Sequence, residues 1–175
     1  MRTVTLGKDL TVGAVGLGCM GFSHAYGPAT GEREAAKFIR EAYYMGYRFF
    51  DTAEVYGTAE DPHVNERIVG EAMHGLRSDV VIASKFGLRF DLESGAVPYP
   101  LIPDSRPETI RRSVEGSLKR LQTDHIDLYF QHRIDPGVEP EAVAQVMSDL
   151  ILDQAADSYA LRERDDLTVV VAKLL

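Results

Sequence analysis

Hydrophobic positions along this chain fall into two patterns that alternate four times. Short apolar runs predict strands, and these lie at residues 12–20, 47–50, 79–84 and 126–130. Apolar residues three or four positions apart predict helices, and these lie at residues 32–45, 64–73, 107–121 and 140–151. Pro107 fits the start of the third helix, since proline favours the first helical position. The pattern therefore predicts a repeated strand–helix unit.

Alternation of strands and helices is typical of an α/β protein with a parallel sheet. Two architectures fit it, an open doubly wound sheet and a (β/α) barrel. Residues 4–11 precede the first unit and predict a short β-hairpin with Gly7-Lys8-Asp9 as its turn. Residues 87–105 are rich in turn residues and are predicted to form a long loop.

One motif suggests a dinucleotide-binding turn. Gly16, Gly18 and Gly21 have the G-x-G-x-x-G spacing, which in such folds leads directly into a helix. Here about ten loop residues separate Gly21 from the next helix, and the acid about 20 residues further on is Glu41, inside that helix rather than at the end of the second strand. We therefore expect these glycines to allow close packing and close approach of the backbone to a ligand.

Polar residues follow successive predicted strands near their carboxyl ends. Asp51 and Tyr56 follow the second strand, Lys85 the third and His132 the fourth. Because the carboxyl ends of parallel strands share one face of the sheet, these four side chains are expected to meet. His24, in the first loop, is a further candidate for substrate contact.

The four side chains suit proton donation to a developing alkoxide. A lysine ammonium stabilises a tyrosine phenolate, an aspartate orients the lysine, and a histidine can hold a carbonyl oxygen. No metal site is expected, because the chain has neither an H-E-x-x-H motif nor a cysteine pair. A Ser-His-Asp triad is conceivable, but no G-x-S-x-G motif accompanies it.

Composition and charge narrow the classes of partner. The 175 residues carry a formal net charge of −8, which disfavours nucleic acid and anionic membrane surfaces as partners. No apolar run approaches the roughly 20 residues of a membrane span. The single cysteine, Cys19, is expected in a buried strand end, and its isolation fits a cytoplasmic protein.

Several segments together resemble the aldo-keto reductase family, in its bacterial, fungal and plant branch. They are GLGCMGF, DTAEVYG, NERIVGEAM, SKFG, SLKRLQTDHIDLYFQHRIDP and EPEAVAQVMSDLI. The resemblance implies a (β/α)8 TIM barrel and NADPH-dependent reduction of an aldehyde or ketone. It implies Tyr56 as the general acid, Lys85 and Asp51 as its tuning pair, and His132 as the residue that orients the substrate. Gly21, Phe22 and Asp51 would approach the nicotinamide end of the cofactor.

The resemblance covers residues 1–151 and ends there. Residues 152–175 form a divergent segment, predicted to hold a helix and, at residues 167–172, a strand. A complete barrel needs about 250 residues, so the expected fold is the N-terminal half of the barrel. The alternative to a small-carbonyl reductase is a catalytically silent half-barrel that lacks most of the cofactor site. Open strand edges predict a homodimer or a complementary half-barrel as partner.

Overall fold

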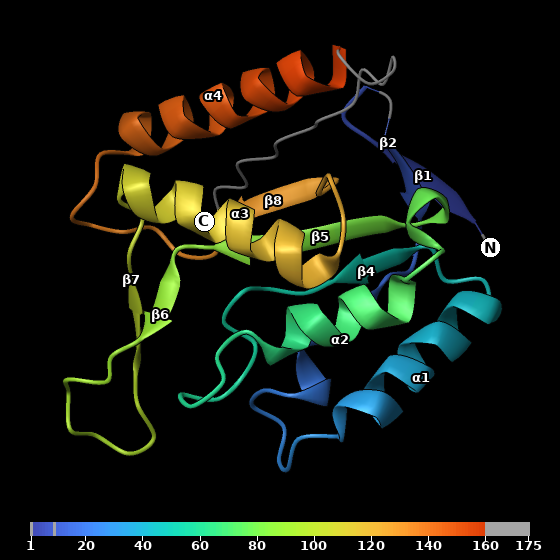
Figure 1. Ribbon diagram of the computed structural model, residues 1–175, viewed down its shortest axis with the longest axis horizontal. Coiled ribbons are helices and arrows are strands. Elements are labelled where there is room, and N and C mark those ends of the chain that lie inside the picture. Colours follow the sequence, from blue (N-terminus) through green and yellow to red (C-terminus); the bar gives the residue numbers. More distant parts are fainter. Residues whose placement is uncertain (1, 9, 160–175) are drawn as a thin grey trace.

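The computed structural model of the protein describes residues 2–8 and 10–159. Its centre is a parallel sheet of four strands, in the order β3-β4-β5-β8 (Figure 1). The strands are β3 (Leu17–Gly18), β4 (Phe49–Asp51), β5 (Val81–Phe86) and β8 (Leu128–Gln131). Strands that follow one another along the parallel repeat are also neighbours in the sheet. This order is that of a (β/α) barrel, because a doubly wound sheet reverses its order at a switch point.

Consecutive helices pack against one another along the sheet (Figure 1). The helices are α1 (Glu32–Tyr44), α2 (Val64–Met73), α3 (Pro107–Leu121) and α4 (Pro140–Tyr159). The packing pairs are α1 with α2, α2 with α3, and α3 with α4. All four helices therefore follow the curvature of one sheet, and the fold is a partial (β/α)8 barrel.

The core lies between this sheet and these helices. Phe50 and Ile82 point from β4 and β5 toward the helices and are fully buried, with Ile39, Val69 and Ile110 in the same apolar cluster. Burying one such side chain contributes about 2 kcal/mol. The side chains at the alternate positions of these strands point to the opposite face of the sheet, where the candidate site lies.

Local sequence explains where the helices begin and end. Pro107 occupies the first turn of α3, as predicted, and Gln122 ends that helix in the left-handed conformation with φ of 54°. Gly46 follows α1 with φ of 100°, a conformation that glycine adopts without a steric penalty. The bounds of α2 agree with the predicted residues 64–73.

Three predicted segments differ from the structure. The run 12–20 is divided, because Leu10–Gly13 (β2) pairs antiparallel with Thr3–Leu6 (β1), and only Leu17–Gly18 joins the parallel sheet. Residues 87–105 are not a simple loop, since Leu88–Phe90 (β6) and Leu101–Pro103 (β7) pair antiparallel.

The fourth helix also runs past its predicted end at residue 151 and continues to Tyr159. The strand predicted at residues 167–172 lies outside the described residues. Two short 3-10 turns, Met20–Phe22 (η1) and Arg77–Asp79 (η2), complete the elements. No helix in the described part of the chain is long and apolar enough to cross a membrane.

Candidate active site

The structure brings the four predicted catalytic residues to one end of the sheet, at the carboxyl ends of its strands. Asp51 is the last residue of β4, Lys85 lies near the end of β5, and His132 directly follows β8. Tyr56 lies in the loop between β4 and α2. Parallel pairing aligns the three strand ends, because the His132 amide still donates a hydrogen bond of 2.8 Å to the Phe86 carbonyl.

Lys85 is the central side chain of this group. Its Nζ lies 2.6 Å from Asp51 Oδ1 and donates a second hydrogen bond of 2.7 Å to the Thr52 carbonyl. The same ammonium lies 4.8 Å from the centroid of the Tyr56 ring. Lys85 is therefore held by two oxygen acceptors on one side while its positive charge lies beside the tyrosine.

Tyr56 is held on several sides and is only 8% exposed. Its ring meets the His132 ring edge to face, with centroids 5.5 Å apart and planes at 82°. Its backbone carbonyl accepts a hydrogen bond of 2.7 Å from Ser23 Oγ. Tyr56 also joins a small apolar cluster with Val55 and Leu88, so few rotamers are open to the ring.

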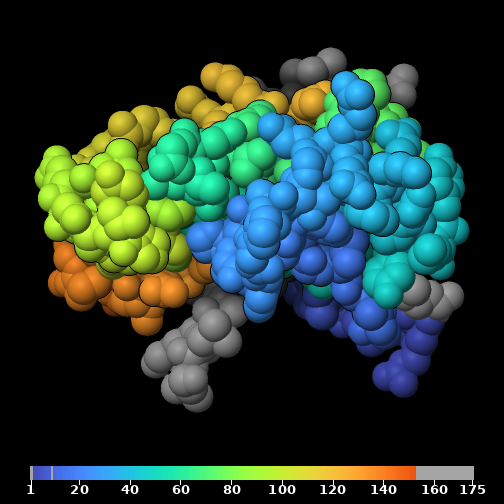
Figure 2. All heavy atoms as spheres, turned by 90° about the horizontal axis from the view of Figure 1, so that it is seen from below, coloured from blue at the N-terminus to red at the C-terminus, as the bar shows by residue number. Residues whose placement is uncertain are grey.

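The β6–β7 hairpin forms a wall behind this tyrosine. Leu88 is buried against Val55 and Tyr56, while Phe90 and Leu101 pack on the same cluster. In Figure 2 the yellow-green segment that contains the hairpin lies beside the blue first loop. The segment predicted as a loop thus supplies ordered apolar support to the site.

His132 is neutral at neutral pH. Burial lowers its pKa to about 4, and the positive charge of Lys85 acts in the same direction. Its Nδ1 is buried and has no hydrogen-bond partner among the described residues. A neutral imidazole carries one N–H, so His132 can donate a hydrogen bond to a substrate oxygen without adding a charge.

His24 joins the aromatic side of the site. Its ring stacks on Tyr56 with centroids 5.9 Å apart and meets the Phe90 ring at 6.3 Å. Its Nδ1 lies 2.7 Å from the Gly57 carbonyl. Because a carbonyl only accepts, Nδ1 must carry a proton, and the ring orientation is fixed. His24 therefore lies beside Tyr56, and its contact with a substrate stays a prediction.

The predicted cofactor residues lie beside Asp51. Gly21 and Phe22 belong to η1, and the Cys19 amide donates a hydrogen bond of 2.8 Å to the Asp51 carbonyl. No α-helix starts at Gly21, since α1 begins at Glu32, and this agrees with the expectation that Gly16, Gly18 and Gly21 do not form a dinucleotide-binding turn. The loop thus presents backbone, rather than the N-terminus of an α-helix, next to the candidate catalytic residues.

Cys19 is fully buried, as predicted. Burial raises the pKa of its thiol to about 12, and the nearby Asp51 charge adds to this effect. A thiol with so high a pKa stays protonated and is a poor nucleophile. Cys19 therefore serves as a packing residue under the first loop.

Sequence reasoning missed three buried polar residues close to the site. Asn65 and Glu66 lie in the first turn of α2 and are 0% exposed, and Glu54, in the Asp51–Tyr56 loop, is 6% exposed. The sequence did contain a signal for Asn65. This residue lies four and seven positions before Val69 and Ala72, so it falls on the same face of the helix as these buried residues. A polar residue on an apolar helical stripe indicates a buried hydrogen-bond network.

Two of these residues are carboxylic acids with different environments. Glu66 lies 2.7 Å from the Arg120 guanidinium and accepts a hydrogen bond of 2.5 Å from Ser84. Glu54 accepts a hydrogen bond of 3.1 Å from the Gly87 amide. Burial raises the pKa of Glu54 to about 7, and the charge of Glu66 adds to the rise, while a hydrogen bond from Ser113 opposes it. Glu54 therefore titrates near neutral pH.

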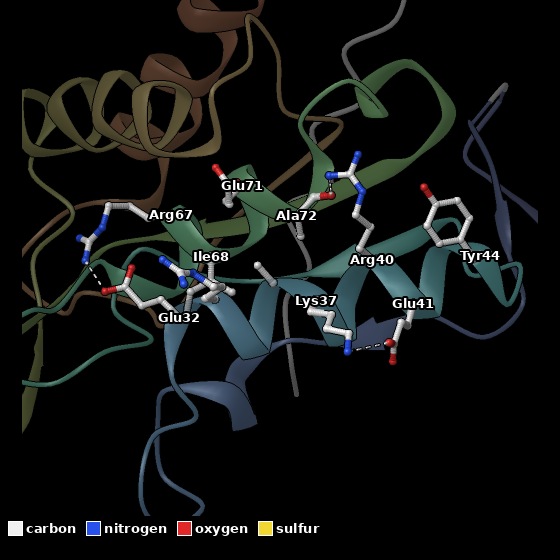
Figure 3. A pocket seen from close by; sticks show the side chains of 11 residues that line it. Glu32, Lys37, Arg40, Glu41, Tyr44, Arg67, Ile68, Glu71 and Ala72 are labelled. Carbon is white, nitrogen blue, oxygen red and sulfur yellow. Dashed lines mark hydrogen bonds and ion pairs between the residues drawn. The ribbon is translucent and has the colours of Figure 1, made fainter.

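A separate groove lies on the outer surface between α1 and α2 (Figure 3). Charged side chains line much of it. One ion pair joins its two helices, Arg67 of α2 with Glu32 of α1, and a second, Lys37 with Glu41, runs along α1. None of the four candidate catalytic residues is among its lining residues. The groove is therefore distinct from the site at the strand ends.

Comparison with known proteins shows the family of this chain. The sequence profile of the Aldo/keto reductase family matches residues 14–164. The chain belongs to the aldo-keto reductase family. The match includes all four residues at the strand ends and extends past residue 151, where the resemblance was predicted to end.

Similar aldo-keto reductases are longer than this chain. A probable aldo-keto reductase from Glycine max is 36% identical over 171 residues, which are 97% of this chain and 47% of the relative. An aldo-keto reductase from Bacillus halodurans, solved in its holo form, has a TM-score of 0.73 and 32% identity and covers 88% of this chain and 47% of its own. The chain thus spans about half the length of these relatives.

One solved relative contains the expected cofactor. An aldo-keto reductase from Klebsiella pneumoniae, in complex with NADPH, has a TM-score of 0.63 and 28% identity. The similarity covers 87% of this chain and 46% of that protein. The described partial barrel therefore corresponds to about half of a family member that binds NADPH.

Proposed function

We propose that this protein reduces an aldehyde or ketone to an alcohol with NADPH, with Tyr56 as the general acid. The observation that carries the proposal is the placement of Lys85, whose ammonium is bound to Asp51 at 2.6 Å and lies 4.8 Å from the Tyr56 ring centroid. A positive charge in this position stabilises the phenolate that remains when Tyr56 gives up its proton.

The residues around Tyr56 each have a distinct role in this proposal. Asp51 and the Thr52 carbonyl fix the direction of the Lys85 ammonium, because both accept its hydrogen bonds. His132, neutral and edge-on to Tyr56, donates a hydrogen bond to the substrate oxygen beside the phenol. Tyr56 transfers its proton to that oxygen as it becomes an alkoxide. The burial of Tyr56 holds its ring in place beside His132 and Lys85.

The donor set fits a nicotinamide cofactor, because these side chains can move protons but none can reduce a carbonyl. NADPH, when bound, supplies the hydride. Gly21, Phe22 and Asp51 would hold its nicotinamide end, since η1 lies directly against the end of β4. The complex of the Klebsiella pneumoniae relative with NADPH supports this choice of cofactor. We place the protein in the cytoplasm, where NADPH is available.

The test is an assay of NADPH oxidation with 4-nitrobenzaldehyde, alongside fluorescence titration of NADPH. Tyr56→Phe should lower kcat by about a hundredfold or more while NADPH still binds. Tyr26→Phe is the matched control, because Tyr26 is 76% exposed, and it should keep full activity. No NADPH binding, or equal activity of Tyr56→Phe, would overturn the proposal.

A second proposal is a catalytically silent half-barrel that acts as an assembly partner. Within the described residues, β3 and β8 each pair with a single neighbour, so one edge of each strand is free to pair. A second copy of the chain, or a complementary half-barrel, would pair with these edges. Sedimentation should then show a dimer without NADPH turnover, whereas a monomer that reduces 4-nitrobenzaldehyde would contradict this reading.

A further inference from the structure

Asn65 is the centre of a buried hydrogen-bond network beneath the site. Thr52 Oγ1 donates to its Oδ1 at 2.7 Å. Its Nδ2 donates to the Cys19 carbonyl at 2.9 Å and to Ser23 Oγ at 2.6 Å. Ser23 in turn donates to the Tyr56 carbonyl at 2.7 Å. Because the Cys19 carbonyl can only accept, the side-chain amide has one allowed orientation.

The network joins the two loops from which the site is built. Cys19 and Ser23 flank η1, which holds Gly21 and Phe22, while Thr52 and Tyr56 belong to the loop after β4. Asn65, Thr52 and Cys19 are 0% exposed, and Ser23 is 5% exposed. Burial shields these bonds from solvent and strengthens them, so each loop is held at a fixed place relative to the other.

We propose that Asn65 is a positioning residue that fixes the cofactor-facing loop relative to Tyr56 and Lys85. Lys85 is included because its Nζ hydrogen-bonds the backbone of Thr52, a direct partner of Asn65. Asn65 touches neither cofactor nor reacting atoms and acts through Ser23 and Thr52. Its effect on NADPH binding rests on the proposed function, but its effect on the two loops does not.

The decisive variant is Asn65→Asp, which keeps the shape but turns an acceptor toward the Cys19 carbonyl. Hydrogen–deuterium exchange in residues 17–24 and 52–57 should accelerate together by about tenfold or more, since buried bonds are lost at both. The control is Ile68→Val, which removes one buried methylene from the same helix. Urea unfolding of both variants separates a local effect from a global loss of stability.

Two variants that disturb the network less test the positioning role if Asn65→Asp fails to fold. Thr52→Val keeps the shape but removes the hydroxyl that donates to Asn65, whereas Thr52→Ser keeps it. Exchange in residues 17–24 should accelerate in Thr52→Val and stay slow in Thr52→Ser, although Thr52 is outside that segment. Equal exchange in residues 17–24 for both Thr52 variants would overturn the proposal.

NADPH titration adds a functional readout. Asn65→Asp should raise the Kd of NADPH by about tenfold more than Ile68→Val does, because it displaces the loop of Gly21 and Phe22. If the unmodified chain binds no NADPH, the proposed function fails, and the exchange data still decide the role of Asn65. If NADPH binds equally to both variants, the positioning role is wrong.

Discussion

Lys85 and Asp51 form an ion pair across neighbouring strands, with Nζ and Oδ1 2.6 Å apart. The register of β4 and β5 places Asp51 opposite Ala83, so Lys85 lies two residues further along the same face. The side chains are 16% and 38% exposed. A pair with this exposure adds little to stability, so its main consequence is the direction in which the ammonium points.

Replacing Lys85 tests this orientation. Lys85→Met keeps much of the side-chain volume but removes the charge beside Tyr56, so kcat should fall by about a hundredfold or more. Steady-state NADPH oxidation measures the change. Lys119→Met, at an exposed position of α3, is the matched control and should retain activity. Activity of Lys85→Met near that of the control would refute the role of the charge.

The charge state of His132 can be measured directly. Its pKa of about 4 lies below the ordinary value of 6.5, so the folded protein should hold a neutral imidazole at pH 6. Nitrogen-15 NMR of the histidine rings reports this state, and His132→Gln assigns the signal. The unfolded chain binds more protons between these two values, so His132 lowers stability as the pH falls from 6.5 to 4. An imidazolium signal at pH 6 would contradict the buried environment.

Glu54 should make stability depend on pH in the opposite sense. Its pKa is about 7 in the folded protein against an ordinary value of 4.5, so the folded state binds more protons between these values. Stability attributable to Glu54 is therefore lost as the pH rises from 4.5 to about 7. Glu54→Gln stays neutral and should gain over the unmodified protein at pH 8, by at most about 3 kcal/mol.

Urea unfolding at pH 5 and pH 8 measures this gain, and Glu115→Gln on the exposed side of α3 is the control. The gain should appear at pH 8 in Glu54→Gln alone. Equal differences at the two pH values would show that the Glu54 carboxyl does not retain its proton in the folded state.

The buried pair of Glu66 and Arg120 gives a stability prediction. Arg120→Met leaves the fully buried Glu66 without its cation and should cost about 3–5 kcal/mol in the free energy of unfolding. Arg112→Met on the exposed face of α3 should cost little. The double variant Glu66→Met with Arg120→Met should recover part of the loss, because no unpaired charge remains. Urea denaturation curves compare the three variants with the unmodified protein.

Sequence patterns predicted the elements whose signals are local. Pro107 marked the start of α3, and the apolar stripe of α2 gave its bounds, because both depend on residues within the element. The β6–β7 hairpin was missed, since each of its strands has three residues and shows too few positions for alternation. Contacts of Leu88 and Phe90 with the distant Tyr56 hold it in place.

The candidate site, too, could be predicted only in part from the sequence. Asp51, Lys85 and His132 could be placed together because parallel strands bring their carboxyl ends to one face. The partners of Asn65 could not be predicted, because its hydrogen bonds reach residues 13 to 46 positions away along the chain. The roles of the four catalytic candidates remain predictions, which the assays above test.

The β6–β7 hairpin can vary in sequence and length independently of the parallel sheet. Its strands pair only with each other among the described residues, and they lie between β5 and α3 along the chain. Its tip, including the 89% exposed Val97, can lengthen, shorten or change sequence without altering the register of the parallel sheet. Related chains can therefore vary at this wall while they keep the same four candidate catalytic residues at the strand ends.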